Sequence, residues 1–306
     1  MKEGLVLGAG YIGCRLVERL IGDGWKMGAL TRNPEAAARL RAVGATVIQG
    51  LIGEDGWHKS FEGDFEAVWN TVGAAGNGLE GYRESYIKGN LSIGRWLQRS
   101  GVSVGSLWFT SSVSVYPQTD GSWVDEGAST EGGSGGSEIL LEAEKTVRDL
   151  AAPAKRGVCR LAGIYGPGRH LLLARLLEGS AVVPGDPNTY LNLIHQEDAV
   201  AALQTLPSKV GRGFHVFNLS DGKPGTRGEI VAHLAERLGR SVPEFNPEQS
   251  ARPMGARLEA GGKVPNRRIE SSLIWKTLGF GPQFEDFRAG YGRILKDLES
   301  REGRER

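Results

Sequence analysis

The chain has 306 residues, of which 40% are hydrophobic and 24% are charged, as in ordinary globular proteins. Its 37 basic and 36 acidic residues leave a net charge of +1, which argues against a nucleic-acid partner and an RNA-processing role. We find no signal peptide and no apolar run of membrane-spanning length, and so expect a cytoplasmic protein without a membrane partner. This length predicts one large α/β domain plus a smaller lobe.

The only cysteines are Cys14, in a predicted helix, and Cys159, in a predicted strand. We expect both to be buried, unpaired thiols in a reducing compartment. The sequence offers no set of metal ligands, so no metal site is predicted.

The first thirty residues predict a dinucleotide site. The apolar strand Leu5–Leu7 runs directly into Gly8-Ala9-Gly10-Tyr11-Ile12-Gly13, and a segment with helical spacing follows. In this setting Gly8 would allow a tight turn, Gly10 would let a pyrophosphate approach the backbone, and Gly13 would let helix and strand pack closely. The phosphates would lie at the helix N-terminus, which favours anions. The alternative is a glycine-rich turn without a ligand.

The end of the next predicted strand, Trp25–Leu30, indicates which dinucleotide binds. An acidic residue there would accept hydrogen bonds from the ribose of NAD, whereas an arginine can pair with the 2′-phosphate of NADP. Because Thr31 and Arg32 occupy this position, we predict NADP as the preferred cofactor and NAD as the other. The alternative is a solvated arginine on a loop.

Strands and helices alternate along the rest of the chain. The further predicted strands are 45–49, 65–72, 106–110, 157–161, 191–194 and 215–219. The predicted helices are 34–43, 86–99, 138–150, 170–177, 196–206, one beginning at Thr226 with Glu229 in a capping box, 271–278 and 284–298. Residues 73–76 form a small-residue turn, residues 127–136 a flexible loop or lid, and residues 299–306 a frayed end.

This alternation predicts an α/β fold, a Rossmann-type doubly wound parallel sheet with a smaller C-terminal substrate lobe. Residues 1–163 would form the dinucleotide-binding domain, with residues 191–222 returning to it. Residues 164–190 and 223–306 would form the lobe. Ligands of such sheets bind at the carboxyl ends of the strands.

Five motifs in this order resemble the extended, atypical short-chain dehydrogenase/reductases of the NAD-dependent epimerase/dehydratase family. They are the glycine turn, Thr110–Tyr116, Arg160–Gly168, Leu193–Asp198 and Phe217–Gly222. The resemblance implies an oxidoreductase, epimerase or dehydratase that acts on a sugar nucleotide or a small carbonyl compound. Thr31–Pro34 is similar to the NADP-preferring members, and a homodimer through paired helices is common among similar proteins.

The resemblance also implies the residues of the site. Cofactor contacts are expected from Gly8, Gly10, Tyr11, Ile12, Gly13, Thr31, Arg32, Thr71, Val72, Gly73, Thr110, Ala162, Gly163 and Ile164. Ser112 matches the family's catalytic serine, which hydrogen-bonds the reacting oxygen; the alternative is a local hydrogen bond. Substrate contacts are expected from Tyr116, Tyr165, Arg169 and His195.

The chain departs from the family at its Tyr-x-x-x-Lys motif, whose tyrosine is the general acid/base and whose lysine lowers the pKa of that tyrosine. Aligning Glu144 with the family's acidic residue puts Gly136 where Tyr is expected and Leu140 where Lys is expected. Leu51 stands where similar proteins often carry an acid near the adenine. Losing the general acid/base costs roughly 10²–10⁴-fold in rate.

The departure leaves alternatives open. Tyr116, Tyr165 and His195 are candidate replacement acids, or else packing residues at the edge of the pocket. A redox-inactive NADP sensor that acts through a partner protein is the alternative to an enzyme. Arg169 and the cluster Lys263–Arg268 could meet an anionic substrate or be solvated, and Phe287 and Tyr291 are expected in the core of the lobe.

Overall fold

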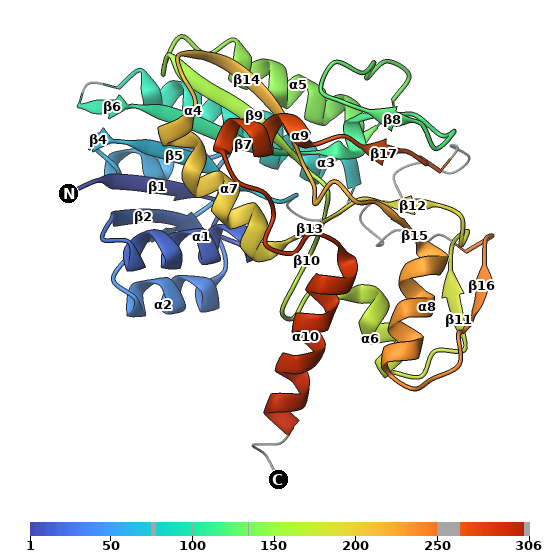
Figure 1. The fold of residues 1–306 in the computed structure, drawn as a ribbon. Coiled ribbons are helices and arrows are strands. Elements are labelled where there is room, and N and C mark those ends of the chain that lie inside the picture. Colours follow the sequence, from blue (N-terminus) through green and yellow to red (C-terminus); the bar gives the residue numbers. More distant parts are fainter. Residues whose placement is uncertain (75–77, 100, 134, 250–263, 303–306) are drawn as a thin grey trace. The chain divides into compact units, whose positions relative to one another are not determined.

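The computed structural model describes residues 1–74, 78–99, 101–133, 135–249 and 264–302 (Figure 1). By its contacts the chain divides into two units. The first unit comprises Met1–Val115, Thr130–Arg160 and Val200–Phe217, and the second comprises Tyr116–Ser129, Leu161–Ala199 and Asn218–Arg306. The second unit includes residues 116–129, 161–163, 191–199 and 218–222, which the sequence analysis assigns to the dinucleotide-binding domain, and the domain boundaries stay a prediction.

The first unit is built on a seven-stranded sheet in the order β14-β9-β7-β5-β1-β2-β3. Its strands are β1 (Glu3–Leu7), β2 (Lys26–Thr31), β3 (Thr46–Gln49), β5 (Ala67–Asn70), β7 (Ser106–Ser112), β9 (Lys155–Leu161) and β14 (Gly213–Leu219). The β3-β2-β1-β5-β7 pairs are parallel. Strand order reverses between β1 and β5, the topological switch point at which doubly wound sheets bind ligands.

The helices of the first unit cover this sheet (Figure 1). They are α1 (Tyr11–Gly22), α2 (Pro34–Ala42), α4 (Gly89–Leu97), α5 (Gly136–Arg148) and the C-terminal half of α7 (Gln196–Lys209), with the short turns η1 (Asp55–Ser60), α3 (Gly78–Tyr82), η2 (Arg83–Lys88) and η3 (Val113–Val115). The short strands β4 (Gly63–Phe65) and β6 (Val102–Val104) pair with each other. Apolar side chains of strands and helices pack into a core cluster in which Leu5, Trp96 and Phe109 are fully buried.

Two predicted elements of the first unit need correction. The predicted strand 65–72 is shorter: Phe65 belongs to β4, and β5 ends at Asn70, whose side-chain oxygen accepts the backbone N–H of Val72 at 3.2 Å. The predicted helix 86–99 begins earlier, at Gly78, and contains the π-helical turn η2. Periodicity could not reveal this turn, because the extra residue shifts the side-chain spacing away from 3.6.

The second unit is assembled from short strand pairs and helices. The pairs are β8 (Trp123–Val124) with β17 (Arg268–Ile269), β10 (Gly163–Tyr165) with β13 (Leu193–His195), β11 (Val182–Pro184) with β16 (Glu244–Asn246), and β12 (Tyr190–Leu191) with β15 (Gly225–Thr226). Its helices are α6 (Leu171–Leu177), α8 (Arg227–Arg237), α9 (Ser272–Leu278) and α10 (Phe287–Glu302). Phe287 and Tyr291 lie in the core of this unit, as predicted.

The predicted strand 191–194 is also corrected, since it is two strands, β12 and β13. Asn192 separates them: its side chain donates to the carbonyl of Arg267 at 2.9 Å and accepts from the N–H of Ile269 at 2.7 Å. The segment therefore pairs with different neighbours before and after Asn192.

The predictions for the capping box and the cysteines are confirmed, whereas the prediction for the C-terminal end is not. The capping box at Thr226 and Glu229 is present at the start of α8, and Cys14 and Cys159 are free and buried, as predicted. The predicted frayed end is helical as far as Glu302, and residues 303–306 lie outside the described residues. No helix in the described part of the chain is long and apolar enough to cross a membrane.

Candidate functional site

The three glycines of the turn after β1 meet three different surroundings. Gly8 has φ +84°, and a Cβ on it would lie 2.5 Å from the Cα of Val72. A Cβ on Gly13 would lie 2.5 Å from Oγ1 of Thr71. A Cβ on Gly10 would meet nothing closer than 3.9 Å. Gly8 and Gly13 are therefore required by the packing of the protein itself, whereas the backbone at Gly10 is open to a ligand.

The turn leads into an open helix N-terminus. Gly10 is the N-cap of α1, no side chain caps the first turn, and that turn carries no acidic residue. Tyr11 and Ile12 begin the helix at this point. An uncapped helix N-terminus without a nearby acid is a favourable place for an anion.

The end of β2 lies beside the glycine turn. Thr31 is buried, and its hydroxyl donates to the carbonyl of Ala9 at 3.1 Å. Arg32 is exposed, and its guanidinium donates to the carbonyl of Ala74, after β5, at 3.4 Å. Asn33 caps α2 by accepting the N–H of Ala36 at 2.9 Å. The first unit thus brings an arginine to the switch point between β1 and β5. Ala75 and Gly76 of the predicted turn lie outside the described residues.

The hydroxyl groups at the ends of β5 and β7 form hydrogen bonds within the protein. Thr71 donates to the carbonyl of Gly8 at 3.0 Å, and the buried Thr110 donates to the carbonyl of Asn70 at 3.3 Å. Ser112 is half-buried, and its Oγ accepts the N–H of Ser114 at 3.1 Å. Val72 is half-buried and Gly73 exposed. The two threonines therefore hold the strand ends together, and Ser112 makes the local hydrogen bond that was its alternative role.

Helix α5 carries no proton donor at the family's two catalytic positions. Gly136 has no side chain, and Leu140 is buried among apolar neighbours at 2% exposure. Glu144 is held by Arg160, whose Nη2 lies 2.7 Å away, and it accepts the hydroxyl of Ser111 at 2.6 Å. This buried ion pair anchors α5 to β7 and β9.

A buried pair of asparagines was missed by sequence reasoning. Asn70 donates to Oδ1 of Asn90 at 2.7 Å, and Asn90 donates to the carbonyl of Ala143 at 3.2 Å. The pair joins β5, α4 and α5 at the last residue of β5. The signal was an asparagine directly after the apolar residues Ala67–Trp69, because a buried amide needs polar partners.

The second unit holds the other predicted cofactor residues. Ala162 donates its N–H to the carbonyl of Leu219 at 3.0 Å, and Gly163 donates to the carbonyl of Asn192 at 2.9 Å. Ile164 is half-buried and pairs with Ile194 in the β10–β13 ladder. A Cβ on Gly163 would lie 3.0 Å from the Asn192 oxygen, so the strand pair itself favours glycine there.

The aromatic and histidine candidates of the second unit are buried. Tyr116 is fully buried, and its hydroxyl donates to Asn218 at 2.8 Å. Tyr165 and His195 stand opposite each other in the β10–β13 ladder, with ring centroids 5.2 Å apart. Burial lowers the pKa of His195 to about 4 and raises that of Tyr165. These contacts support the packing alternative for all three residues.

The predicted basic residues of the second unit differ in their surroundings. Arg169 is exposed. Arg268 lies over the rings of Trp123 and Tyr190, with 5.1 Å from its guanidinium carbon to each centroid, so its charge is engaged by cation–π contacts. Arg267 is buried, and Lys263 lies outside the described residues.

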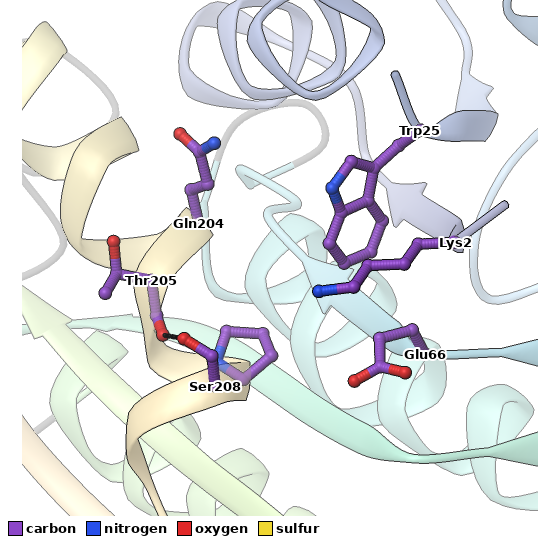
Figure 2. Close-up of a pocket in the computed structure, with 7 residues that line it drawn as sticks. Lys2, Trp25, Glu66, Gln204, Thr205 and Ser208 are labelled. Atoms are coloured by element: carbon purple, nitrogen blue, oxygen red, sulfur yellow. Dashed lines mark hydrogen bonds between the residues drawn. The ribbon is translucent and has the colours of Figure 1, made fainter. Parts of the chain in front are cut away.

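A separate pocket opens at the amino ends of β1, β2 and β5, the edge opposite the glycine turn (Figure 2). Its volume is about 210 Å³, and Lys2, Trp25 and Glu66 form one wall. The ammonium of Lys2 lies 5.2 Å from the centroid of the Trp25 ring. No predicted site residue lines this pocket.

Comparison with known proteins assigns the family. The model of the NAD dependent epimerase/dehydratase family matches residues 5–220, and the chain belongs to this family. It is similar to Protein YeeZ of Escherichia coli (strain K12), with 26% identity over 295 residues, covering 94% of this chain and 97% of YeeZ.

Solved structures show the same fold. MoeE5 in complex with UDP-glucuronic acid and NAD superposes with a TM-score of 0.79 at 24% identity, covering 97% of this chain and 99% of MoeE5. DesIV, a dTDP-glucose 4,6-dehydratase from Streptomyces venezuelae with NAD bound, superposes with a TM-score of 0.80 at 20% identity, covering 98% of each chain.

Proposed function

We propose that the first unit binds NADP, with NAD as the weaker cofactor. The observation that carries the proposal is the difference among the three glycines: Gly8 and Gly13 are needed for packing, whereas Gly10 leaves backbone open beside an uncapped helix N-terminus. A pyrophosphate bound there would accept hydrogen bonds from the first turn of α1. This arrangement fits the dinucleotide of the family.

Arg32 supports NADP over NAD. Its exposed guanidinium stands at the end of β2, where the adenosine ribose of a Rossmann-bound dinucleotide lies. Thr31 and Asn33 use their side chains within the protein, so Arg32 is the group available to a 2′-phosphate. Arginine pairs with phosphate through parallel hydrogen bonds, whereas the diol of NAD would prefer an acid.

The remaining cofactor contacts extend this site. Within the first unit we assign them to Tyr11, Ile12, Thr71, Val72, Gly73 and Thr110. The contacts that the family resemblance implies for Ala162, Gly163 and Ile164 stay a prediction. When bound, the nicotinamide would supply or accept a hydride, and Ser112 would hydrogen-bond the reacting oxygen.

The substrate proposal is a sugar nucleotide or small carbonyl compound, acted on by an oxidoreductase, epimerase or dehydratase. It is supported by the family and by MoeE5, which binds UDP-glucuronic acid and, in another structure, UDP-glucose. We assign substrate binding to the second unit, with the exposed Arg169 as an anion contact.

Calorimetric titration of the purified protein with NADP⁺, NADPH, NAD⁺ and NADH tests the cofactor. We expect the phosphorylated pair to bind at least about tenfold more tightly, which corresponds to roughly 1.4 kcal/mol. Arg32→Asp should abolish this preference, because it places an acid where the 2′-phosphate would lie. Lys59→Asp makes the same charge change at an exposed position in η1 and should leave the preference intact.

Two results would contradict the proposal. Binding of none of the four dinucleotides would leave the glycine turn as scaffold only. An unchanged NADP preference in Arg32→Asp would remove Arg32 from the site.

A second candidate function is a redox-inactive NADP sensor, which the missing side chains at Gly136 and Leu140 favour. A sensor must bind NADP⁺ and NADPH with different affinities, since only differential binding can shift an equilibrium. Equal affinity for the two forms in the same titration counts against a sensor.

A further inference from the structure

The segment Gly78–Lys88 neighbours α5, the helix that lacks the family's catalytic tyrosine. This segment packs against α5 through both α3 and η2. A charge pair ties the two together, since Nη1 of Arg83 lies 3.8 Å from Oε2 of Glu142. The segment therefore stands beside the helix that lacks the phenol.

Two tyrosines of this segment face each other. The rings of Tyr82 and Tyr86 meet edge to face, with centroids 5.3 Å apart. The π-helical turn η2 begins directly after Tyr82 and contains Tyr86. Such turns are frequent at functional sites.

The tyrosine pair lies at the carboxyl ends of β5 and β7. The backbone of Ala74, which follows β5, lies close enough to the hydroxyl of Tyr86 to act on its pKa. The ring of Tyr86 meets that of Phe109, near the end of β7, at 6.1 Å. Because Arg32 marks the adenosine side at β2, the dinucleotide crosses the switch point toward β5 and β7 with its nicotinamide half.

The two tyrosines differ in their neighbours. Tyr86 packs against Phe109, and burial raises its pKa to about 12. Tyr82 is half-buried at the end of α3. We therefore take Tyr86 as a packing residue of this pair, which leaves the hydroxyl of Tyr82 as the candidate for contact with a ligand.

We propose that Tyr82 faces the nicotinamide half of the bound dinucleotide and replaces the absent tyrosine of α5 as the proton donor. This inference rests on the dinucleotide site proposed above. Without the family's lysine, a neutral phenol acts as an acid, so the favoured direction is reduction of a carbonyl. Tyr82 would donate its O–H proton to the carbonyl oxygen, and the reduced nicotinamide, when bound, would supply the hydride for the carbon. The phenolate then regains a proton from water, and the product is the alcohol.

The first test needs no turnover. Ultraviolet absorbance of the phenolate, taken as wild type minus Tyr82→Phe, follows the ionisation of Tyr82 as pH rises. Oxidised nicotinamide is a cation, whereas reduced nicotinamide is neutral, so we expect the midpoint in the NADP⁺ complex to lie about half a unit or more below that in the NADPH complex. Equal midpoints overturn the inference. If neither cofactor binds, the proposed function itself has failed.

The second test compares matched variants with NADPH and 9,10-phenanthrenequinone as the carbonyl probe. Tyr82→Phe should lower kcat by roughly 10²–10⁴-fold and abolish the loss of activity at alkaline pH, with NADPH affinity unchanged. Tyr86→Phe makes the same chemical change four residues away and should keep both the rate and the pH profile. Equal effects of the two variants overturn the inference, as does a wild type that binds NADPH without reducing the probe.

Discussion

Single residues of the glycine turn separate packing from ligand binding. All three glycines belong to one sequence pattern, yet only two of them touch other parts of the protein closely. Gly13 sits against Thr71 and Val6, so α1 can approach β1 only without a side chain there. Gly10 has an ordinary φ of −104° and an open surrounding, so its lack of a side chain has no packing reason.

Alanine substitution distinguishes these two roles. Gly13→Ala should destabilise the protein by about 1–3 kcal/mol, because the added methyl overlaps Thr71. Gly10→Ala should leave thermal unfolding unchanged and weaken NADP binding by at least about tenfold. Unfolding curves and calorimetry on both variants check this; normal NADP binding by a folded Gly10→Ala protein would contradict the ligand role.

Asp221 is a buried carboxyl group in the second unit with an unsatisfied oxygen. Its Oδ1 accepts the N–H of Lys223 at 3.0 Å, whereas its buried Oδ2 has no hydrogen-bond partner among the described residues. Burial raises its pKa to about 7, and the nearby carboxylates of Asp286 and Asp198 add to this rise. The native state thus favours protonated Asp221.

The raised pKa makes stability depend on pH. Unfolded Asp221 ionises near its ordinary pKa of 3.8, whereas the native group retains its proton until about pH 7. The native state therefore loses stability progressively as pH rises between these values, by a total on the order of a few kcal/mol. Asp221→Asn carries no proton to lose, and should be more stable than wild type at pH 8 and equal to it near pH 4. Denaturant unfolding at several pH values measures the difference, with the exposed Asp64→Asn as control. A pH-independent difference would refute the argument.

Among the elements, α5 lacks the family's catalytic side chains but is still held firmly against its neighbours. The Glu144–Arg160 pair and the hydroxyl of Ser111 hold its C-terminal half, and Asn90 hydrogen-bonds the carbonyl of Ala143. Its inner face packs through Ile139, Leu140 and Val147. Leu140, at the position of the family's lysine, is one of these packing residues, and Gly136, at the position of the tyrosine, carries no side chain, so the helix stays anchored without the two catalytic groups.

Removing one member of the buried ion pair should be costly. Glu144→Gln leaves the buried Arg160 guanidinium without its counter-charge, and we expect a loss of about 3–5 kcal/mol in unfolding free energy. Glu142→Gln, on the same helix, breaks only the solvent-exposed pair with Arg83, and should cost at most about 0.5 kcal/mol. Chemical denaturation compares the two; similar losses would mean that the buried pair does not anchor α5.

At the scale of the whole molecule, the family motifs are shared between the two units. The glycine turn and the strand ends at Thr71 and Thr110 belong to the first unit, and Ala162–Ile164 to the second. The second unit draws on three separate stretches of chain, joined by two-stranded pairs such as β8 with β17. The predicted homodimer stays a prediction.

Local features of this protein were determined by the sequence alone. The strand–turn–helix at residues 5–20, the capping box at Thr226 and the sequence of family motifs all depend on neighbouring residues, so spacing and composition suffice to predict them. They led to the α/β Rossmann-type fold and to the family, both of which are confirmed.

Tertiary structure alone decided which side chains meet. The Glu144–Arg160 pair, the Asn70–Asn90 pair, the Arg32 contact with Ala74 and the edge-to-face rings beside Phe109 join residues 16 to 42 positions apart, or depend on a π-helical turn that breaks the helical period. No periodicity encodes such contacts, because they form only when separate elements pack and exclude water from the groups between them. The absence of the usual catalytic tyrosine can therefore be read from the sequence. The packing of η2 against α5, from which we propose Tyr82 as its replacement, can be seen only in the structure.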